Sequence, residues 1–164
     1  MAHKEHPVII LGGGPAGAVT AMNLLRRGIT PVIVERDDHP RYHVGESLTG
    51  ATAISLKELG LGPVIEAQNY PVKHGAVFYG PDGKNDFWVG LVRRDENNEQ
   101  VPNYTWNVMR SPFDKILFEA AIERGAIWIH APAPAPIVRD DPRIRPTTRT
   151  PAGARRHADA RRLA

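Results

Sequence analysis

Cysteine is absent from the 164-residue sequence. Its absence excludes disulfide bonds, thiolate catalysis, cysteine-ligated metals and cysteine-linked cofactors. Long apolar runs are also absent, because none approaches the roughly 20 residues that a membrane-spanning helix needs. The first six residues, Met1-Ala2-His3-Lys4-Glu5-His6, are polar and lack the apolar stretch of a signal peptide. The sequence therefore predicts a cytoplasmic protein without a membrane span.

Local motifs for hydrolysis and metal binding are missing as well. No Gly-x-Ser-x-Gly segment occurs that would present a nucleophilic serine to a histidine and an acid. His39 and His43 are four residues apart, but Pro40 lies between them and prevents a shared helical face. No further ligand at metal-binding spacing completes this pair, so we expect no metal site.

Net positive charge is confined to the C-terminal segment. Residues 131–164 contain eight arginines and three aspartates, a balance of +5 that leaves −2 of the total of +3 for the other 130 residues. Because this segment has no aromatic residue to stack on a base, we expect no specific nucleic-acid binding. Alanine, proline and arginine make up 22 of its 34 residues. We expect a disordered tail, and its abrupt composition fits a frameshift or truncation better than a natural flexible tail.

The most informative segment that is present is a glycine-rich turn, Gly12-Gly13-Gly14-Pro15-Ala16-Gly17, directly after an apolar run. Its G-x-G-x-x-G spacing between a strand and a helix predicts a βαβ unit that binds a dinucleotide. Gly12 permits the tight turn, Gly14 lets the backbone approach a pyrophosphate, and Gly17 lets the helix pack closely on the strand. The pyrophosphate is then expected at the helix N-terminus.

The chain after this turn completes the expected unit. A helix is predicted from about Pro15 to Arg27, ended by Gly28. The apolar residues 31–34 predict the next strand, and Glu35 follows it. A carboxylate at this distance from the turn is expected to accept hydrogen bonds from the ribose hydroxyls of the adenosine. It would repel a 2′-phosphate, so NADP is disfavoured.

The remaining sequence alternates between helical and extended patterns. Residues 36–47 read as a polar loop, and the Pro-Asp-Gly turn at 81–83 predicts a β-hairpin. Ser111 is the expected N-cap of a helix that carries Asp114 as its capping-box acid and ends at Gly125. The other expected elements are a helix over 51–59, hairpin strands over 76–79 and 86–89, a charged loop over 93–100, a strand over 103–109 and a strand from 126 to 130.

The predicted fold class is α/β. We expect an incomplete, doubly wound Rossmann-type domain for FAD or NAD(P) over residues 1–130, with a piece of a β-rich substrate domain at about 72–109. The tail over residues 131–164 follows it. The loop residues Arg41, Gly45, Glu46 and Ser47 are placed to reach over the carboxyl ends of the strands, where ligands bind in such sheets. From residue types alone, an ordinary polar loop is the simpler interpretation of them.

With these pieces in order, the sequence resembles the N-terminal part of FAD-dependent monooxygenases and, more closely, flavin-dependent halogenases. The resemblance rests on four blocks between residues 7 and about 130. They are Gly12-Gly13-Gly14-Pro15-Ala16-Gly17 with Glu35-Arg36, Arg41-Tyr42-His43-Val44-Gly45-Glu46-Ser47-Leu48, Lys73-His74-Gly75-Ala76-Val77-Phe78, and Trp106-Asn107-Val108-Met109-Arg110-Ser111-Pro112-Phe113-Asp114-Lys115-Ile116-Leu117. The combination of the second and third blocks points to halogenases.

The resemblance implies a cofactor, a catalytic residue and partners. FAD would be held at its ADP half by Gly12, Gly14, Gly17, Glu35 and Arg36, and Pro15, Ala16 and Arg41 would be further cofactor-binding residues. Gly45, Glu46 and Ser47 would lie near the flavin, and Arg110 would contact the ribityl–phosphate region. Lys73 matches the family's lysine, which relays or activates hypohalous acid toward an electron-rich aromatic substrate. A separate reductase would supply the reduced flavin.

Departures from the family's pattern keep two alternatives open. No Gly-Asp dipeptide, the family's second flavin motif, occurs, and the W-x-W-x-I-P signature of tryptophan halogenases is absent. Position 50 is Gly50 where the family usually has proline. One alternative is a related FAD monooxygenase or a geranylgeranyl-reductase-like flavoenzyme. The other is an inactive nucleotide-binding remnant.

Overall fold

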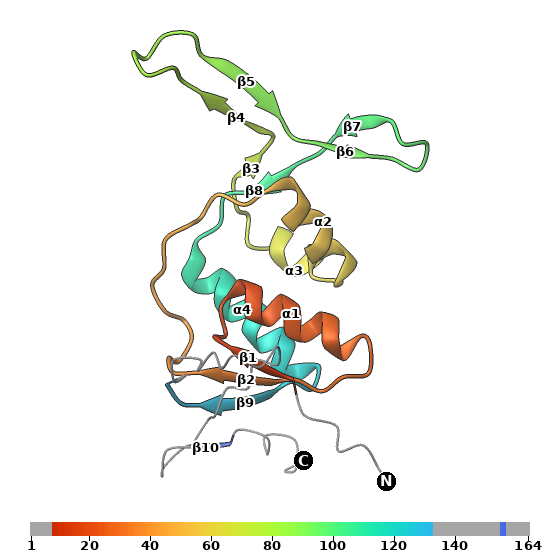
Figure 1. Ribbon diagram of the computed structural model, residues 1–164, viewed down its shortest axis with the longest axis vertical. Helices are drawn as coiled ribbons and strands as arrows, with labels where there is room; N and C mark the ends of the chain where they lie inside the picture. The colour runs from red at the N-terminus through yellow and green to blue at the C-terminus, as the bar shows by residue number, and fades with distance from the viewer. Residues whose placement is uncertain (1–7, 133–154, 157–164) are drawn as a thin grey trace, which may run out of the picture. The chain divides into compact units, whose positions relative to one another are not determined.

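The computed structural model describes residues 8–132 and 155–156, which fall into two compact units. Unit 1 combines Met1–Arg41 with Asp114–Ala164, and unit 2 is Tyr42–Phe113. Figure 1 labels the helices and strands along the chain. Most of the tail predicted over 131–164 lies outside the described residues, so its expected disorder stays a prediction.

A parallel sheet forms the base of unit 1. Its strands are β1 (Ile9–Leu11), β2 (Val32–Glu35), β9 (Ile127–His130) and β10 (Arg155–Arg156). The order is β1-β2-β9-β10; the first three run parallel, and β10 pairs antiparallel with β9. Ile33 at the centre of β2 pairs with Ile10 on one side and Trp128 on the other. This arrangement is the α/β fold expected from the sequence.

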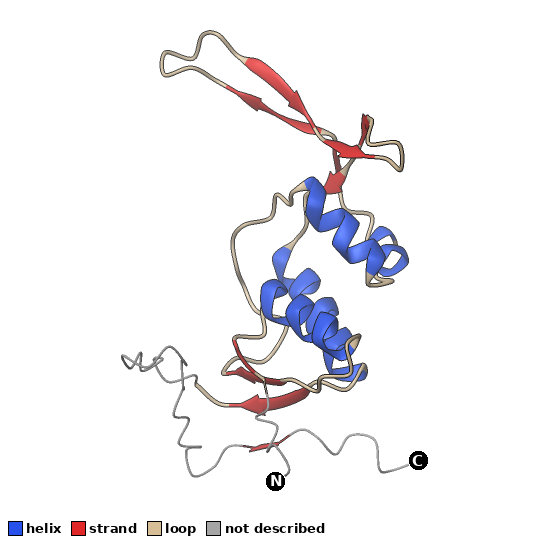
Figure 2. Ribbon diagram, turned by 45° about the vertical axis from the view of Figure 1, so that its right-hand side comes forward, coloured by secondary structure: helices blue, strands red, loops and turns tan. Residues whose placement is uncertain are grey.

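Two helices pack on this sheet. They are α1 (Pro15–Leu25) and α4 (Arg110–Glu123), which lie on the same side of the strands in Figures 1 and 2. The helical spacing of the apolar residues in α1 places Ala18, Ala21 and Met22 in the core. Gly28 has a φ of +76° just beyond α1, which confirms its role as the stop. The wholly or almost wholly buried side chains of unit 1 include Ala18, Ala21, Met22, Ile33, Val34, Leu117, Phe118 and Ala121.

Unit 2 contains two helices and six short strands. They are α2 (Gly50–Glu58), α3 (Gly62–Glu66), β3 (Val72–Lys73), β4 (Gly75–Phe78), β5 (Phe87–Gly90), β6 (Val92–Arg94), β7 (Gln100–Pro102) and β8 (Thr105–Trp106). The strands pair antiparallel as β3-β8, β4-β5 and β6-β7. The β4-β5 pair is the hairpin predicted around Pro-Asp-Gly.

Several predicted elements of unit 2 differ from the structure. The charged loop expected over 93–100 is the turn of a second hairpin, because Asp95 Oδ1 accepts the N–H groups of Asn97 and Glu99 and closes it. The strand expected over 103–109 is confined to Thr105–Trp106. Helix α3 was not predicted. Gly60, with a φ of +72°, ends α2 as a stop signal should, but Pro63 lies in the first turn of α3 and supports the start of another helix.

The predicted N-cap of α4 is wrong. The helix begins at Arg110, and the Phe113 N–H donates to the Met109 carbonyl at 3.1 Å. Met109 is therefore the cap residue, and Ser111 lies inside the first turn. Asp114, the expected capping acid, is wholly buried. Within the described residues, no helix is long and apolar enough to cross a membrane.

Candidate functional site

The glycine turn of unit 1 links β1 to α1 as the spacing predicts. The Gly12 N–H donates to the Val34 carbonyl at 2.8 Å, and Gly12 has a φ of +100°, which favours glycine. A Cβ on Gly17 would lie 2.0 Å from the Gly12 carbonyl oxygen. The first and last glycines are therefore required by the protein's own backbone.

Gly14 is different, because the protein alone leaves room for a side chain there. A Cβ on Gly14 would lie 3.6 Å from Arg41 Nη2, an ordinary contact. Gly14 is also the N-cap of α1 and provides no side-chain cap. The free space above Gly14 and the uncapped helix start together form a cradle suited to an anionic group.

Glu35 closes the turn from the end of β2. Its Oε2 accepts the Gly13 N–H at 2.7 Å and Arg41 Nη2 at 3.2 Å, and its Oε1 accepts the Asp37 N–H at 2.9 Å. Burial alone would raise the pKa of Glu35, but the Asp37 and Gly13 N–H groups and the Arg41 charge outweigh burial and lower it. Glu35 is thus an ionised carboxylate with acceptor capacity left on Oε1.

His39 and Arg41 carry unsatisfied nitrogens beside this carboxylate. The His39 ring stacks on Phe118 with centroids 4.5 Å apart, and both of its ring nitrogens are buried without a hydrogen-bond partner among the described residues. Arg41 Nε is likewise buried without a hydrogen-bond partner among the described residues. Burial, reinforced by the Arg41 charge, lowers the pKa of His39. Buried polar atoms without partners often mark the place of a ligand or water.

In unit 2, the structure brings Gly45 and Arg110 together. Arg110 Nη1 donates to the Val44 carbonyl at 2.6 Å, and a Cβ on Gly45 would lie 3.2 Å from the same nitrogen. Gly45 has a φ of +97°. A side chain at position 45 would therefore be strained and would crowd the guanidinium.

The Lys73 side chain contacts the end of the Gly45–Leu48 segment of the same unit. Its Nζ donates to Ser47 Oγ at 2.9 Å and to the Leu48 carbonyl at 3.2 Å. Lys73 is partly buried, on β3. The second and third sequence blocks therefore meet at one ammonium group.

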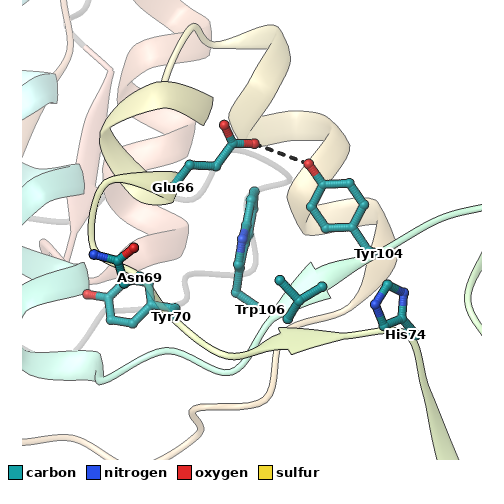
Figure 3. A pocket seen from close by; sticks show the side chains of 7 residues that line it. Glu66, Asn69, Tyr70, His74, Tyr104 and Trp106 are labelled. Carbon is teal, nitrogen blue, oxygen red and sulfur yellow. Dashed lines mark hydrogen bonds between the residues drawn. The ribbon is translucent and has the colours of Figure 1, made fainter.

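An open pocket of about 580 Å³ lies elsewhere in unit 2 (Figure 3). Its lining residues are Glu66, Asn69, Tyr70, Val72, His74, Tyr104 and Trp106. The Tyr104 hydroxyl donates to Glu66 Oε1 at 3.1 Å, and Lys57 Nζ lies 4.0 Å from the centroid of the Tyr104 ring. Lys73 is not part of this lining.

The predicted site residues are only partly in contact within each unit. In unit 1 the glycine turn, Glu35 and Arg41 are in contact, whereas Arg36 is exposed and paired with Asp37 at 3.4 Å. Pro15 is in the first turn of α1, and Ala16 is exposed beside it. In unit 2 Glu46 contributes its carbonyl oxygen, which accepts the Val108 N–H at 2.8 Å. Within the described ranges no group of three histidine or acidic side chains could hold a metal ion.

Sequence reasoning missed Gly13 and His39 as members of the unit 1 cluster. A Cβ on Gly13 would lie 2.6 Å from Phe118 Cε2, so the middle glycine is required as well. The G-x-G-x-x-G pattern treats that position as free, and no local signal marks it. For His39 a signal exists, since it lies in the loop that follows the strand ending at Glu35; from the sequence we consider it only as a metal ligand and reject that role.

Comparison with known proteins agrees with this geometry. The profile of the family described as FAD binding domain matches residues 5–161. A 1H-pyrrole-2-carbonyl-[peptidyl-carrier protein] brominase of Pseudoalteromonas luteoviolacea (strain 2ta16) is 35% identical over 122 residues, which are 74% of this chain and 28% of the relative. The flavin-dependent halogenase gsfI of Penicillium aethiopicum is 39% identical over 119 residues, 73% of this chain and 21% of the relative.

Solved structures give the same result. The flavin-dependent brominase Bmp2 superposes with a TM-score of 0.68 at 30% identity, covering 82% of this chain and 31% of that one. The flavin-dependent halogenase CmlS gives a TM-score of 0.65 at 36% identity, covering 76% and 22%. The chain thus spans less than a third of the length of each of these relatives. It belongs to the FAD-binding domain family, the relatives that it matches include flavin-dependent halogenases, and FAD is its cofactor.

Proposed function

We propose that this chain is the flavin-binding part of a flavin-dependent halogenase that acts on an electron-rich aromatic substrate. The observation that carries the proposal is the Lys73 ammonium held by Ser47 and Leu48 within the Gly45–Leu48 segment. That contact unites the two sequence blocks that distinguish halogenases from other FAD-dependent enzymes. A lysine ammonium can donate hydrogen bonds to hypohalous acid, which suits the proposed role.

The residues of unit 1 fit the ADP half of FAD. The glycines present backbone with no side chain in front of α1, and Gly14 has space that the protein does not use. The unpaired Nε of Arg41 provides a cation for the pyrophosphate. Glu35 would accept a ribose hydroxyl with its remaining capacity, and Pro15, Ala16 and Arg36 would border the same half. These assignments rest on the contacts described above and on the family's motif.

The residues of unit 2 fit the flavin half. Gly45 and Glu46 would present backbone to the ring, and the Arg110 guanidinium at Gly45 would face the ribityl–phosphate region. When bound, reduced FAD would supply two electrons for the reduction of O₂, and halide would supply the other two as it is oxidised to hypohalous acid. Lys73 then holds the hypohalous acid through an N–H group and orients it toward the aromatic carbon that is halogenated. The ammonium also provides a proton for the departing hydroxide, which leaves as water, and the resulting amine takes up the proton that the halogenated ring carbon loses.

The partners follow from the same proposal. A separate flavin reductase would supply reduced FAD in the cytoplasm. The substrate class is an electron-rich aromatic ring; the name of one relative specifies a pyrrole attached to a peptidyl-carrier protein. A carrier-bound ring is therefore one form in which the substrate could be presented to this chain.

Cofactor binding is tested with Gly14→Ala. The added methyl group fits the free protein, because its Cβ meets only an ordinary contact and Gly14 has a φ of −70°. The wild-type chain should quench FAD fluorescence with saturable, micromolar affinity, and Gly14→Ala should lose this binding while its circular dichroism stays unchanged. Thr20→Ala, at an exposed position of α1 beyond the glycine turn, is the control that keeps binding. Wild-type protein that folds but does not bind FAD would support the inactive-remnant alternative.

Activity is tested in a chimera in which this chain replaces the matching part of the pyrrolyl-carrier-protein brominase. Lys73→Ala should abolish bromination of that relative's substrate and leave FAD binding unchanged. A chimera that binds FAD and hydroxylates the ring, with or without Lys73, would favour the monooxygenase alternative. Bromination that survives Lys73→Ala would remove Lys73 from the mechanism.

A further inference from the structure

The Lys73 side chain lies on one face of a small sheet in unit 2. Strand β8 pairs with β3 on one side, with Lys73 opposite Thr105 and Val72 opposite Trp106. On its other side the same segment pairs with the 46–48 stretch through a bridge between Ser47 and Asn107. Residues opposite one another, and residues two apart, share a face. Lys73, Thr105, Asn107 and Ser47 are therefore on one face.

The other face of this sheet carries the open pocket. Val72, His74, Tyr104 and Trp106 alternate with the first set along the two strands and line that pocket (Figure 3). Lys57 belongs to this side, with its Nζ over the Tyr104 ring and 3.9 Å from Glu66 Oε1. Unit 2 thus offers two lysines in contrasting environments, one of them paired with a carboxylate.

Lys73 is held by neutral acceptors. Ser47 Oγ at 2.9 Å and the Leu48 carbonyl oxygen at 3.2 Å accept two of its three hydrogens. In the described part of the chain no carboxylate lies within 4.0 Å of its Nζ, whereas Lys57 has Glu66 at that range. Two neutral dipoles fix the position of the ammonium without cancelling its charge, and they leave one N–H for an external acceptor.

Within the described part of the chain, not every polar group on the Lys73 face has a hydrogen-bond partner, as Thr105 shows. The residue is wholly buried, stands directly opposite Lys73 on β8, and its hydroxyl has no hydrogen-bond partner among the described residues. Ser47, in contrast, is exposed and uses its hydroxyl on the lysine. Of the two hydroxyls that share the face with Lys73, only that of Ser47 holds the ammonium.

We propose that Ser47 is a positioning residue for Lys73, rather than a contact of the flavin as the resemblance implied. Its hydroxyl and the adjacent Leu48 carbonyl confine the ammonium to one place and aim its remaining N–H. The functional consequence rests on the proposed role of Lys73 in halogenation. The structural part, the confinement of the ammonium, does not.

The test measures hydrogen exchange of the Lys73 ammonium in protein labelled with ¹⁵N-lysine. Lys73→Arg and Lys57→Arg assign the two side-chain ¹⁵N signals. Ser47→Ala should speed hydrogen exchange of the Lys73 ammonium about tenfold, the amount expected from one hydrogen bond to a charged donor. Ser47→Thr should restore slow exchange, and the exchange rate of the Lys57 ammonium should stay the same in both position-47 variants. Thr105→Val is the matched control, since it removes a hydroxyl on the same face that does not hold the ammonium.

Each result decides the proposal. Unchanged exchange at Lys73 in Ser47→Ala would overturn it, and so would an equal effect of Thr105→Val. If Ser47→Ala fails to fold, Ser47→Cys keeps the shape with a poor acceptor and takes its place. In the chimera, Ser47→Ala should lower the bromination kcat about tenfold with KM unchanged, and Ser47→Thr should recover it. Loss of the proposed function would appear instead as activity that survives Lys73→Ala, whatever the exchange rates are.

Discussion

At the scale of single residues, neighbouring glycines of the same turn have different reasons to be glycine. Gly12 needs a positive φ, Gly13 makes room for the Phe118 ring, and Gly17 makes room for a carbonyl oxygen. Only Gly14 has no such internal reason, and its free space is the strongest structural argument for a ligand at the start of α1. A motif that reads as one feature in the sequence therefore separates into folding and binding positions.

Gly17→Ala should destabilise the chain strongly. The new Cβ would meet the Gly12 carbonyl oxygen at 2.0 Å, and because this oxygen belongs to the backbone, no side-chain rotation can relieve the clash. We expect the free energy of unfolding to fall by at least about 2 kcal/mol. Gly28→Ala is the comparison, because position 28 has a φ of +76° but open space, and should cost about 1 kcal/mol. Urea unfolding measures both, and equal losses would refute the steric argument.

His39 should make the stability of unit 1 depend on pH. Its pKa is below the ordinary 6.5 in the folded chain, so the unfolded chain binds the proton more readily. Stability is therefore complete above that ordinary value and falls as the pH drops toward the folded pKa. His39→Phe keeps the stack on Phe118 and should remove this loss, so its advantage over wild type should be larger at about pH 5.5 than at about pH 7.5. Chemical unfolding at both pH values measures the difference.

The exposed His43 provides the control for that experiment. His43→Gln should leave the pH dependence as in the wild type. A constant difference between His39→Phe and wild type across this range would show that the buried imidazole does not titrate differently in the folded chain. The effect of Glu35, whose pKa is lowered from 4.5, appears only at more acidic pH and does not interfere.

At the scale of elements, the start of α4 gives a test of how the helix is capped. Met109 is the cap residue and is 65% exposed, while Ser111 lies within the first turn. Met109→Ser should supply a side-chain acceptor for the first N–H groups and raise the free energy of unfolding by about 1 kcal/mol. Ser111→Ala should leave it nearly unchanged. A larger loss from Ser111→Ala would restore Ser111 as the cap.

Elements with local signals were predicted well, and those that depend on distant pairing were not. The turn from β1 to α1, the stop at Gly28 and the Pro-Asp-Gly hairpin each carry their cause within a few residues. The β6-β7 hairpin had a usable signal that was overlooked, since Asp95 and Asn98 are typical turn residues and Asn98 has a φ of +64°. Short strands such as β3 and β8 have no such signal, because each is defined by a partner far away in the sequence.

The site shows the same division. Glu35 and the glycines follow from spacing, but the bonds from Gly13 and Arg41 to the Glu35 carboxylate do not. Likewise, a lysine at position 73 indicates no role by its residue type alone, and the catalytic role came only from the family resemblance. Its contact with Ser47 spans 26 positions and depends on the register of three segments. The sequence therefore proposed candidate residues and left open which of them are in contact.

At the scale of the whole molecule, the sheet of unit 1 corresponds to one half of a doubly wound fold. Its order places β2 between β1 and β9, and among the described strands β1 has β2 as its single neighbour. In doubly wound sheets the first strand is normally central and pairs on both sides. The match to less than a third of each relative's length agrees with this partial sheet.

The β4-β5 hairpin of unit 2 should make the isolated chain self-associate. Phe78 and Phe87 stack across it with centroids 5.4 Å apart, and Phe87 and Trp88 are each 59% exposed. No third strand pairs with β4 or β5 within the described residues. Open strand edges with apolar side chains favour pairing between molecules.

Phe87→Lys with Val89→Lys adds two positive charges to one face of β5 and should weaken this association. Sedimentation velocity over a range of concentrations should show the wild type forming larger species that the double variant does not form. Val64→Lys, at a 39% exposed position on α3, is the control with the same kind of change outside the hairpin. If Val64→Lys disperses the chain equally, net charge rather than the hairpin governs association. A wild type that stays monomeric would mean that its exposed aromatic residues are too few to hold two copies together.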